Sequence, residues 1–242
     1  MSFGRRPVPR APHPPSAVEK VRRKPAAERR EHILSEAAAF FADRGFQGTT
    51  RDLANRLGIT QAALYKHFAS KDEIIAALFD RSAERWRSEN WRPALSDRSQ
   101  SLEAQLTGLY TQYLSRVSGP GLRLFVRAGL DGLGQPARRG AMLTATILEP
   151  VIEALRTDCG LPGRSDKPIL RGEREVAMAL HGGLMFLAIR KHVYRMPMPE
   201  DLSDLVALQV RLWLPGAAHE IRRLHSAGDE PEQLVPRPRR RS

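Results

Sequence analysis

Apolar side chains along most of this chain recur every three or four residues, which is the spacing of one face of an α-helix. In residues 26–44 they fall at Ile33, Ala37, Phe40 and Phe41. No segment alternates apolar and polar residues with a period of two, as a half-buried strand would. The pattern therefore predicts an all-α fold without a β-sheet.

Three further helices are expected next, each preceded by a residue that can cap it. They are predicted at residues 50–57, 61–67 and 71–90. Thr49 and Thr60 stand before the first two, and Ser70 with Glu73 has the spacing of a capping box before the third. Gly58 breaks the chain between the first two helices. This order of elements predicts a helix-turn-helix.

The remainder of the chain predicts a second, larger helical domain. Helical periodicity continues at residues 99–117, 121–133, 138–158, 172–195 and 201–214. Pro150 should kink the third of these stretches, and Pro215-Gly216 should end the fifth. The expected organisation is an arm at 1–25, a first helical domain at 26–86, a second at 95–216 and a tail at 217–242.

Charge is distributed unevenly along the chain, whose net charge is +12. Residues 1–25 carry seven Lys and Arg against one acidic residue and contain six prolines, whereas residues 26–90 carry ten basic and ten acidic residues. Proline at this density prevents a packed helix, so we expect the arm, and also the basic tail, to be disordered. The arm is either a solvated tail or a source of phosphate contacts, because surplus positive charge favours polyanions such as nucleic acid.

Several classes of protein are disfavoured by the composition. The chain has one cysteine, Cys159, so no internal disulfide can form. No apolar run reaches the ~18 residues of a membrane span, and we expect a cytoplasmic protein with no membrane partner. We expect no metal site and no cofactor, because no histidine has a ligand at metal spacing. Neither a nucleophile elbow nor a phosphate-binding glycine loop is present, so we do not expect an enzyme.

Two features of the second domain have alternative interpretations. His181 lies on an apolar helix beside Gly182-Gly183 and is either a packed, hydrogen-bonded residue, which we favour, or a contact to a ligand or partner helix. Four arginines form either a solvated basic face, which we favour, or a receptor for an acidic effector. They are Arg123, Arg127, Arg138 and Arg139.

Residues 49–68 carry the strongest functional signal. A helix-turn-helix presents its second helix to the major groove of DNA, where base edges show a distinct pattern of donors and acceptors. Gln61 can pair with adenine, and the Ala62 methyl can contact thymine methyl groups. Tyr65, Lys66 and His67 can reach phosphates. Hydroxyls at a helix N-terminus, such as those of Thr49 and Thr50, also bind anions well.

From Ala26 to about Trp86 the chain resembles the DNA-binding domain of the TetR family. The shared motifs are Gly45-Phe46, Thr49-Thr50, Leu53-Ala54, Leu57-Gly58-Ile59-Thr60, Leu64-Tyr65, His67-Phe68 and Ser70-Lys71-Asp72-Glu73. The resemblance covers about a quarter of the chain. It implies a homodimer that reads a palindromic operator, usually as a repressor released by a small-molecule effector. The two long C-terminal helices would then pair with their copies across a two-fold axis.

The same resemblance supplies the candidate site residues. The candidate DNA contacts are Thr49, Thr50, Arg51, Thr60, Gln61, Ala62, Tyr65, Lys66, His67 and Lys71. Leu64 and Phe68 are expected in the core. Arg51 stands where the family usually has an aliphatic residue, so a DNA contact and a solvated side chain are equally open. Ala62 replaces a common glycine, which can alter how closely the helix approaches the bases.

Two other classes of function remain as alternatives. A DNA-binding architectural or partner-controlled factor without a ligand would be favoured by a second domain that lacks an enclosed cavity. An enzyme on a helical scaffold would be favoured by a cluster of perturbed acids or bases in a deep pocket.

Overall fold

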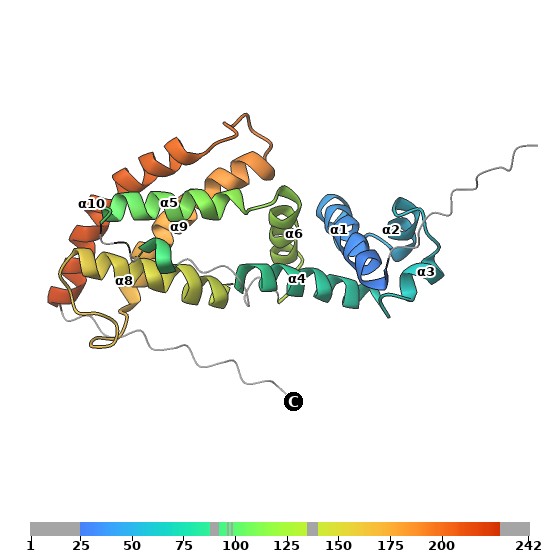
Figure 1. Cartoon of the computed structure of the whole chain (residues 1–242), viewed down its shortest axis with the longest axis horizontal. Coiled ribbons are helices and arrows are strands. Elements are labelled where there is room, and N and C mark those ends of the chain that lie inside the picture. The colour runs from blue at the N-terminus through green and yellow to red at the C-terminus, as the bar shows by residue number, and fades with distance from the viewer. Residues whose placement is uncertain (1–24, 88–91, 96, 98, 135–139, 228–242) are drawn as a thin grey trace, which may run out of the picture.

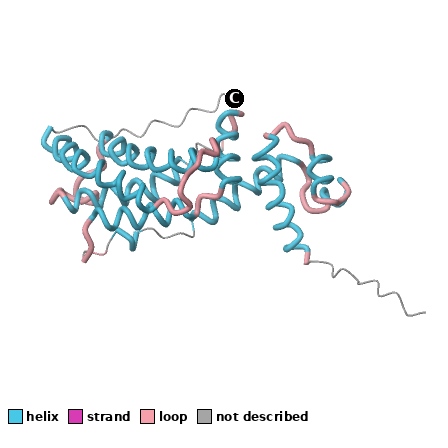
Figure 2. Tube along the Cα trace, turned by 90° about the horizontal axis from the view of Figure 1, so that it is seen from above, coloured by secondary structure: helices cyan, strands magenta, loops and turns pink. Residues whose placement is uncertain are grey.

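The computed structural model describes residues 25–87, 92–95, 97, 99–134 and 140–227. Within these ranges every regular element is a helix, as Figure 2 shows, and the expected all-α fold is confirmed. No described helix is both long enough and apolar enough to cross a membrane. The arm predicted at 1–25, apart from Pro25, and the last part of the tail, 228–242, lie outside the described residues.

The helices form two lobes, which are joined by α4 (Lys71–Arg87) and α6 (Gly119–Leu130) (Figure 1). Their bounds are α1 Ala26–Arg44, α2 Thr50–Arg56, α3 Gln61–Tyr65, α4 Lys71–Arg87, α5 Leu102–Ser115, α6 Gly119–Leu130, α8 Glu149–Asp158, α9 Arg171–His192 and α10 Ser203–Ala227. A 3₁₀ turn, η1 (Arg92–Leu95), precedes α5, and a π-helical turn, η2 (Thr144–Leu148), runs directly into α8. In Figure 1, α4 extends from the lobe of α1, α2 and α3 toward the lobe of the remaining helices, and α6 stands between the lobes.

The first lobe has a core of its own, built from the apolar stripe predicted for residues 26–44. Ile33 and Phe41 are fully buried, and they pack in one cluster with Leu53 of α2, Leu64 of α3 and Ile74 of α4. Each of these side chains contributes about 1.5–3 kcal/mol when removed from water. The crossing of the short helices is therefore held by the same core that holds α1.

The predicted caps of the short helices are present, with one difference. The hydroxyl of Thr49 accepts from the N–H of Asp52, and that of Thr60 accepts from the N–H of Ala63. Ser70 accepts from the N–H of Glu73 at 3.1 Å. The Glu73 carboxylate, however, accepts from the N–H of Ala69 at 2.6 Å, one residue before the position that a capping box predicts. The fourth helix ends at Arg87, and residues 88–90 of its predicted span lie outside the described part.

Pro150 is accommodated by a widened turn. Residues 140–158 of the stretch predicted at 138–158 are continuous helix, with the π-helical turn immediately before α8, and residues 138 and 139 are not described. Proline has no N–H to donate, and its ring clashes with a carbonyl in the preceding turn. The backbone hydrogen bonds of the helix must therefore change at that turn. The hydroxyls of Thr144 and Thr146 donate to the carbonyls of Gly140 and Met142 at 3.0 and 2.8 Å. They satisfy acceptors that lie beside the widened turn.

The prediction that Pro215-Gly216 ends the last helix is wrong. Helix α10 continues through Pro215 to Ala227, so the domain boundary expected at 216 and the tail expected from 217 are misplaced. Ala217, Ile221 and Leu224 are buried, and they extend the apolar stripe begun by Val206 and Val210. Burial of this second stretch outweighs the roughly 3 kcal/mol that an interior proline costs.

A buried ion pair ties three C-terminal elements together. The Arg156 side chain of α8 and the Glu173 carboxylate of α9 both have no exposed surface, and Arg156 Nε donates to Glu173 Oε1 at 2.7 Å. Arg156 also donates to the carbonyls of Pro162, Lys167 and Pro168, which lie between the two helices. His225 of α10 lies 3.0 Å from Glu173 through Nε2. The cluster fixes the loop after α8 and the end of α10.

Helix α6 belongs to both lobes. Leu124 and Ala128 are buried within the N-terminal core, whereas Leu122 is buried in the C-terminal core. Arg127 Nε donates to the carbonyl of Ala42 at 3.1 Å, and its Nη2 donates to that of Asp43 at 3.3 Å. These carbonyls are at the C-terminal end of α1, where helical partners run out. The seam between the lobes is thus a packed and hydrogen-bonded contact.

Candidate nucleic-acid interface

Helices α2 and α3 lie at the end of the molecule farthest from the C-terminal lobe (Figure 1). Gly58 joins them with φ at +64°, a left-handed conformation that a side chain would strain. Leu53 of α2 and Leu64 of α3 are fully buried, and Phe68 just beyond α3 is 1% exposed. The expected core roles of Leu64 and Phe68 are confirmed. The opposite face of α3 is directed away from the core.

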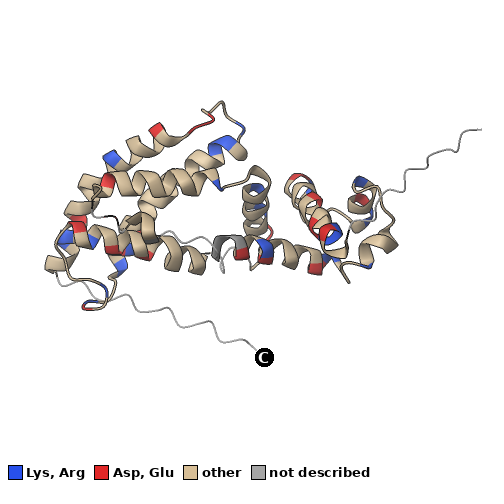
Figure 3. Cartoon of the chain, viewed as in Figure 1, with Lys and Arg blue, Asp and Glu red and all other residues tan. Residues whose placement is uncertain are grey.

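The predicted contact residues fall into three groups by exposure. Six of them are exposed: Thr49, Arg51, Thr60, Ala62, Tyr65 and Lys66. Three are half-buried: Gln61, His67 and Lys71. Thr50 is buried, with 7% of its surface accessible. Figure 3 shows acidic as well as basic residues on this lobe, in line with the even charge balance of residues 26–90.

Thr50 joins the two helices through a small hydrogen-bond network. Its hydroxyl accepts from Nε2 of Gln61 at 2.9 Å and lies 3.0 Å from the hydroxyl of Tyr65. These two side chains come from successive turns of α3, so one buried hydroxyl orients both of them. Thr50 therefore positions both side chains, and its own contact to DNA stays a prediction.

A residue that the sequence analysis missed holds the other end of α3. Arg30 of α1 donates through Nη1 to the carbonyl of His67 at 3.1 Å. Its guanidinium carbon lies 4.0 Å from the centre of the Phe68 ring, and Nη2 lies 3.8 Å from the Glu73 carboxylate. One cation thus joins α1, the end of α3 and the start of α4. Arg29 beside it is equally basic, so the local sequence offered no signal that distinguishes the two.

Two of the arginines with open interpretations are engaged at the seam. Arg127 binds the end of α1, and Arg123 donates to the Asp43 carboxylate at 3.2 Å and to the carbonyl of His192 at 3.2 Å. Both arginines hold helix ends together, but Arg127 is exposed, as a solvated basic face predicts, whereas Arg123 is half-buried. Arg138 and Arg139 lie outside the described residues.

Comparison with known proteins agrees with this geometry. Residues 33–78 match the model for "Bacterial regulatory proteins, tetR family", and this range includes the second part of α1, all of α2 and α3, and the first half of α4. The helix-turn-helix domain of this chain is therefore similar to that of TetR-family regulators. The match includes the whole helix-turn-helix.

Individual relatives extend the likeness beyond that domain. The HTH-type transcriptional repressor KstR2 of Mycolicibacterium smegmatis is 39% identical over 85 residues, 35% of this chain and 40% of that protein. The HTH-type transcriptional activator FasR of the same organism is 29% identical over 154 residues, 62% of this chain and 69% of that protein. The solved structure of a TetR-like transcriptional regulator from Rhodococcus sp. RHA1 has 24% identity and a TM-score of 0.59, covering 80% of this chain and all of that one.

These likenesses differ in what they show. The chain matches about 40% of the length of the first curated relatives. The structural likeness at 24% identity extends over both lobes and shows that the fold is shared. One relative is named a repressor and another an activator, so the names do not agree on the direction of regulation.

Proposed function

We propose that this protein is a transcriptional regulator that binds a palindromic operator as a homodimer and represses transcription until a small molecule releases it. The observation that carries the proposal is the outer face of α3, where Ala62, Tyr65 and Lys66 are exposed at the tip of the molecule. A helix presented in this way fits the major groove.

The roles of the α3 side chains follow from their reach. Gln61 reads an adenine by exchanging or sharing its hydrogen bond to Thr50, and Ala62 contacts a neighbouring base edge. Tyr65, Lys66 and Lys71 bind phosphates and set the register of the helix on the duplex. The remaining candidates flank this surface: Thr49, Arg51, Thr60 and His67.

Exposed apolar side chains on α9 and α10 support the homodimer. Met178 and Phe186 are 39% and 49% exposed, and they flank Gly182 on one stripe of α9. Leu208 and Leu212 of α10 are 45% and 74% exposed and are one turn apart. A Cβ on Gly182 would meet no atom within 4 Å, so this stripe is open to a partner helix. Pairing with the same helices of a second copy removes these surfaces from water and forms a self-complementary interface.

A dimer is also what operator recognition requires. Two recognition helices must enter successive major grooves about 34–36 Å apart, so the dimer interface sets the half-site spacing. A ligand releases the dimer from its operator when it binds more tightly to a state in which the two recognition helices have a different spacing.

Selection of bound duplexes from a random pool tests the regulator directly. We expect an inverted repeat with one fixed half-site spacing. On that sequence, Tyr65→Ala and Lys71→Ala should weaken binding to every duplex, whereas Gln61→Ala should cost about 1–3 kcal/mol and relax preference at one base pair. Equal and small effects of all three substitutions would mean that α3 is not the recognition helix.

A ligand-independent architectural factor is the alternative. It would bind DNA with the same helix, but a second domain without an enclosed cavity would be expected. The cavity described below favours ligand control instead.

A further inference from the structure

A large cavity lies at the seam between the two lobes. Its volume is about 740 Å³, which is the size of sites that enclose drug-sized molecules. The N-terminal lobe contributes Leu78 and Phe79 of α4 to its wall, and the C-terminal lobe contributes Leu122 of α6 and Met185 and Ile189 of α9. Most of this surface is apolar, so an apolar occupant gains by leaving water.

One polar side chain of the wall is buried and has an atom without a partner. His181 of α9 is 5% exposed and lines the cavity, and its Nδ1 has no hydrogen-bond partner within the described part of the chain. The sequence analysis favoured a packed, hydrogen-bonded histidine. The packing is confirmed, because the Tyr113 ring lies edge-on at 5.4 Å and the Tyr110 ring at 6.0 Å. The hydrogen bond to Nδ1 is absent from the described structure.

An unsatisfied buried polar atom is costly, about 1–3 kcal/mol, so a bound group that forms a hydrogen bond with this imidazole ring would offset part of the cost. The hydroxyl of Tyr110, beside the imidazole, also lacks a partner within the described part. Burial lowers the pKa of His181 to about 4, so the ring is neutral at physiological pH. A neutral imidazole offers either a donor or an acceptor at Nδ1, depending on its tautomer.

The charges in the wall do not favour an anionic ligand. Arg81 of α4 lies 3.3 Å from the Glu31 carboxylate of α1, so these two charges offset each other. Arg116 is exposed and therefore already solvated. An ionised group inside the cavity would lose its hydration, and the side chain it meets at His181 is uncharged.

We propose that this cavity binds a largely apolar, uncharged molecule whose hydroxyl group forms a hydrogen bond with the imidazole ring of His181. The proposal deepens the proposed function, on which it rests, by naming the class of effector. A hydroxyl satisfies either tautomer, because it both donates and accepts. The occupant touches α4 and α6 at once, and α6 holds the end of α1 through Arg127. Filling the cavity therefore biases how the DNA-binding lobe sits on the rest.

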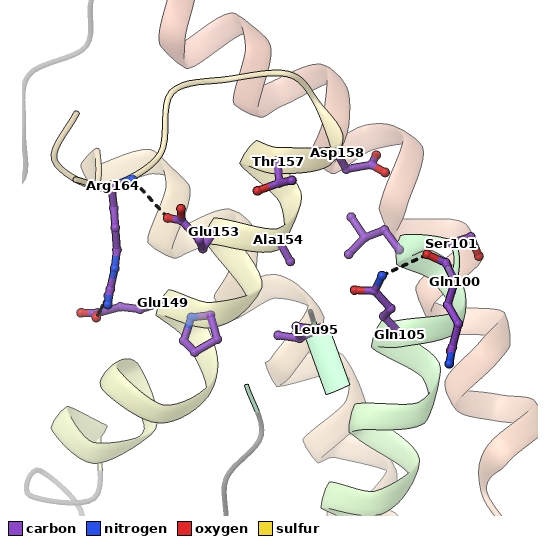
Figure 4. Close-up of a pocket in the computed structure, with 12 residues that line it drawn as sticks. Leu95, Gln100, Ser101, Gln105, Glu149, Glu153, Ala154, Thr157, Asp158 and Arg164 are labelled. Carbon is purple, nitrogen blue, oxygen red and sulfur yellow. Dashed lines mark hydrogen bonds and ion pairs between the residues drawn. The ribbon is translucent and has the colours of Figure 1, made fainter. Parts of the chain in front are cut away.

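A second cavity was weighed against this one. It lies in the C-terminal lobe between α5 and α8, as Figure 4 shows, and has a volume of about 530 Å³. Three of its four charged residues already bind one another, since Arg164 binds Glu149 through Nη1 at 2.6 Å and Glu153 through its backbone N–H at 3.1 Å. No helix of the DNA-binding lobe lines it. Among the described residues that line it, none has a buried polar side-chain atom without a hydrogen-bond partner, and none connects it to α3.

The test uses the full chain without DNA, so that it is independent of operator binding. The neutral dye N-phenyl-1-naphthylamine, whose fluorescence rises in apolar sites, serves as the reporter. The bound dye is titrated with 1-decanol, decanoate and 1-chlorodecane, which share a ten-carbon chain and differ at the end group. We expect 1-decanol to displace the dye at a lower concentration than either of the others.

Variants test whether the preference for 1-decanol depends on His181. His181→Phe should raise the inhibition constant of 1-decanol about fivefold to tenfold, because one hydrogen bond to a buried group is lost, and should leave that of 1-chlorodecane unchanged. His219→Phe, at an exposed position of α10, is the matched control and should change neither. Met185→Trp should reduce binding of the dye itself by filling the cavity. Thermal unfolding of each variant verifies that it is folded.

Several results would overturn the proposal. They are failure of the dye to bind, tighter binding of decanoate than of 1-decanol, or equal effects of His181→Phe on 1-decanol and 1-chlorodecane. Failure of the proposed function is separate, because it would appear as the lack of a selected operator while the dye measurements stand. Dye binding without a selected operator would leave a ligand-binding protein whose role is not in transcription.

Discussion

Replacement of Arg156 by methionine gives the sharpest test of what holds the C-terminal lobe together. The side chain has no exposed surface, and its guanidinium donates to both Glu173 oxygens and to three backbone carbonyls. Methionine fills much of the same volume but donates nothing. The Glu173 carboxylate would then remain buried with only the N–H of Leu170 at 2.7 Å and the His225 ring at 3.0 Å.

The expected cost is large because a buried charge loses its partner. Removing one member of a buried ion pair typically destabilises by about 3–5 kcal/mol, a large part of the roughly 5–15 kcal/mol that stabilises a domain. The matched control is Arg164→Met. Arg164 pairs with Glu149 at 2.6 Å but is 37% exposed, so its loss should cost at most about 1 kcal/mol.

Urea denaturation at pH 7 measures both variants at one fixed protein concentration, because the stability of the proposed dimer would depend on concentration. A double-mutant cycle with Glu173→Gln isolates the pair, and we expect the double variant to be more stable than the sum of the single losses predicts. A loss for Arg156→Met no greater than that for Arg164→Met would refute the reasoning.

The same cluster predicts a pH dependence. Burial alone raises the pKa of Glu173, but hydrogen bonds from Arg156, from the N–H of Leu170 and from His225 outweigh it and hold the pKa below the ordinary 4.5. A carboxyl whose folded pKa is depressed contributes stability above its unfolded pKa and loses it as the pH falls through the folded value. The free energy of unfolding should therefore fall below pH 4.5, and less steeply in Glu173→Gln. Equal slopes in the two proteins would show that Glu173 carries none of this dependence.

Three further predictions concern the functional surfaces. Thr50→Val removes the hydroxyl that orients Gln61 and Tyr65, so operator affinity measured by fluorescence anisotropy should fall several-fold while the unfolding midpoint changes little; unchanged affinity would contradict the positioning role. Leu212→Glu puts a charge on a side chain that is 74% exposed, so light scattering should show a monomer with unchanged helical content, and a persistent dimer would place the interface elsewhere. Arg127→Met removes two hydrogen bonds to α1, so 1-decanol should still displace the dye but no longer alter operator affinity, and a retained response would assign the coupling to α4.

Several features of the site were readable from local sequence because short-range physics decides them. Thr49 and Thr60 cap their helices, since a hydroxyl before a helix satisfies an N–H three residues on. Gly58 adopts a positive φ at the turn that its position suggested. The buried positions of Leu64 and Phe68 follow from the spacing of apolar residues. Each of these inferences used neighbours within one or two helical turns.

Other features depended on residues far apart in the chain. A threonine at the start of a helix, such as Thr50, can bind an anion. Packing of α2 on α3 buries Thr50, and its hydroxyl accepts a hydrogen bond from Gln61. Pro215 should end a helix by its own chemistry, yet α10 continues because burial of Ile221 and Leu224 outweighs the local cost. Arg123 and Arg127 lie on an ordinary basic segment, and only the approach of α1 gives them acceptors.

The sequence by itself determined most of the helices, their caps and the helix-turn-helix, because periodicity, capping and turn geometry act between near neighbours. Tertiary structure alone decided where α6 meets the first lobe, which charges are already paired, and that His181 lines a cavity while its Nδ1 atom has no partner among the described residues. Cavities and buried networks are made by the packing of several helices at once. No single segment of the sequence contains that information.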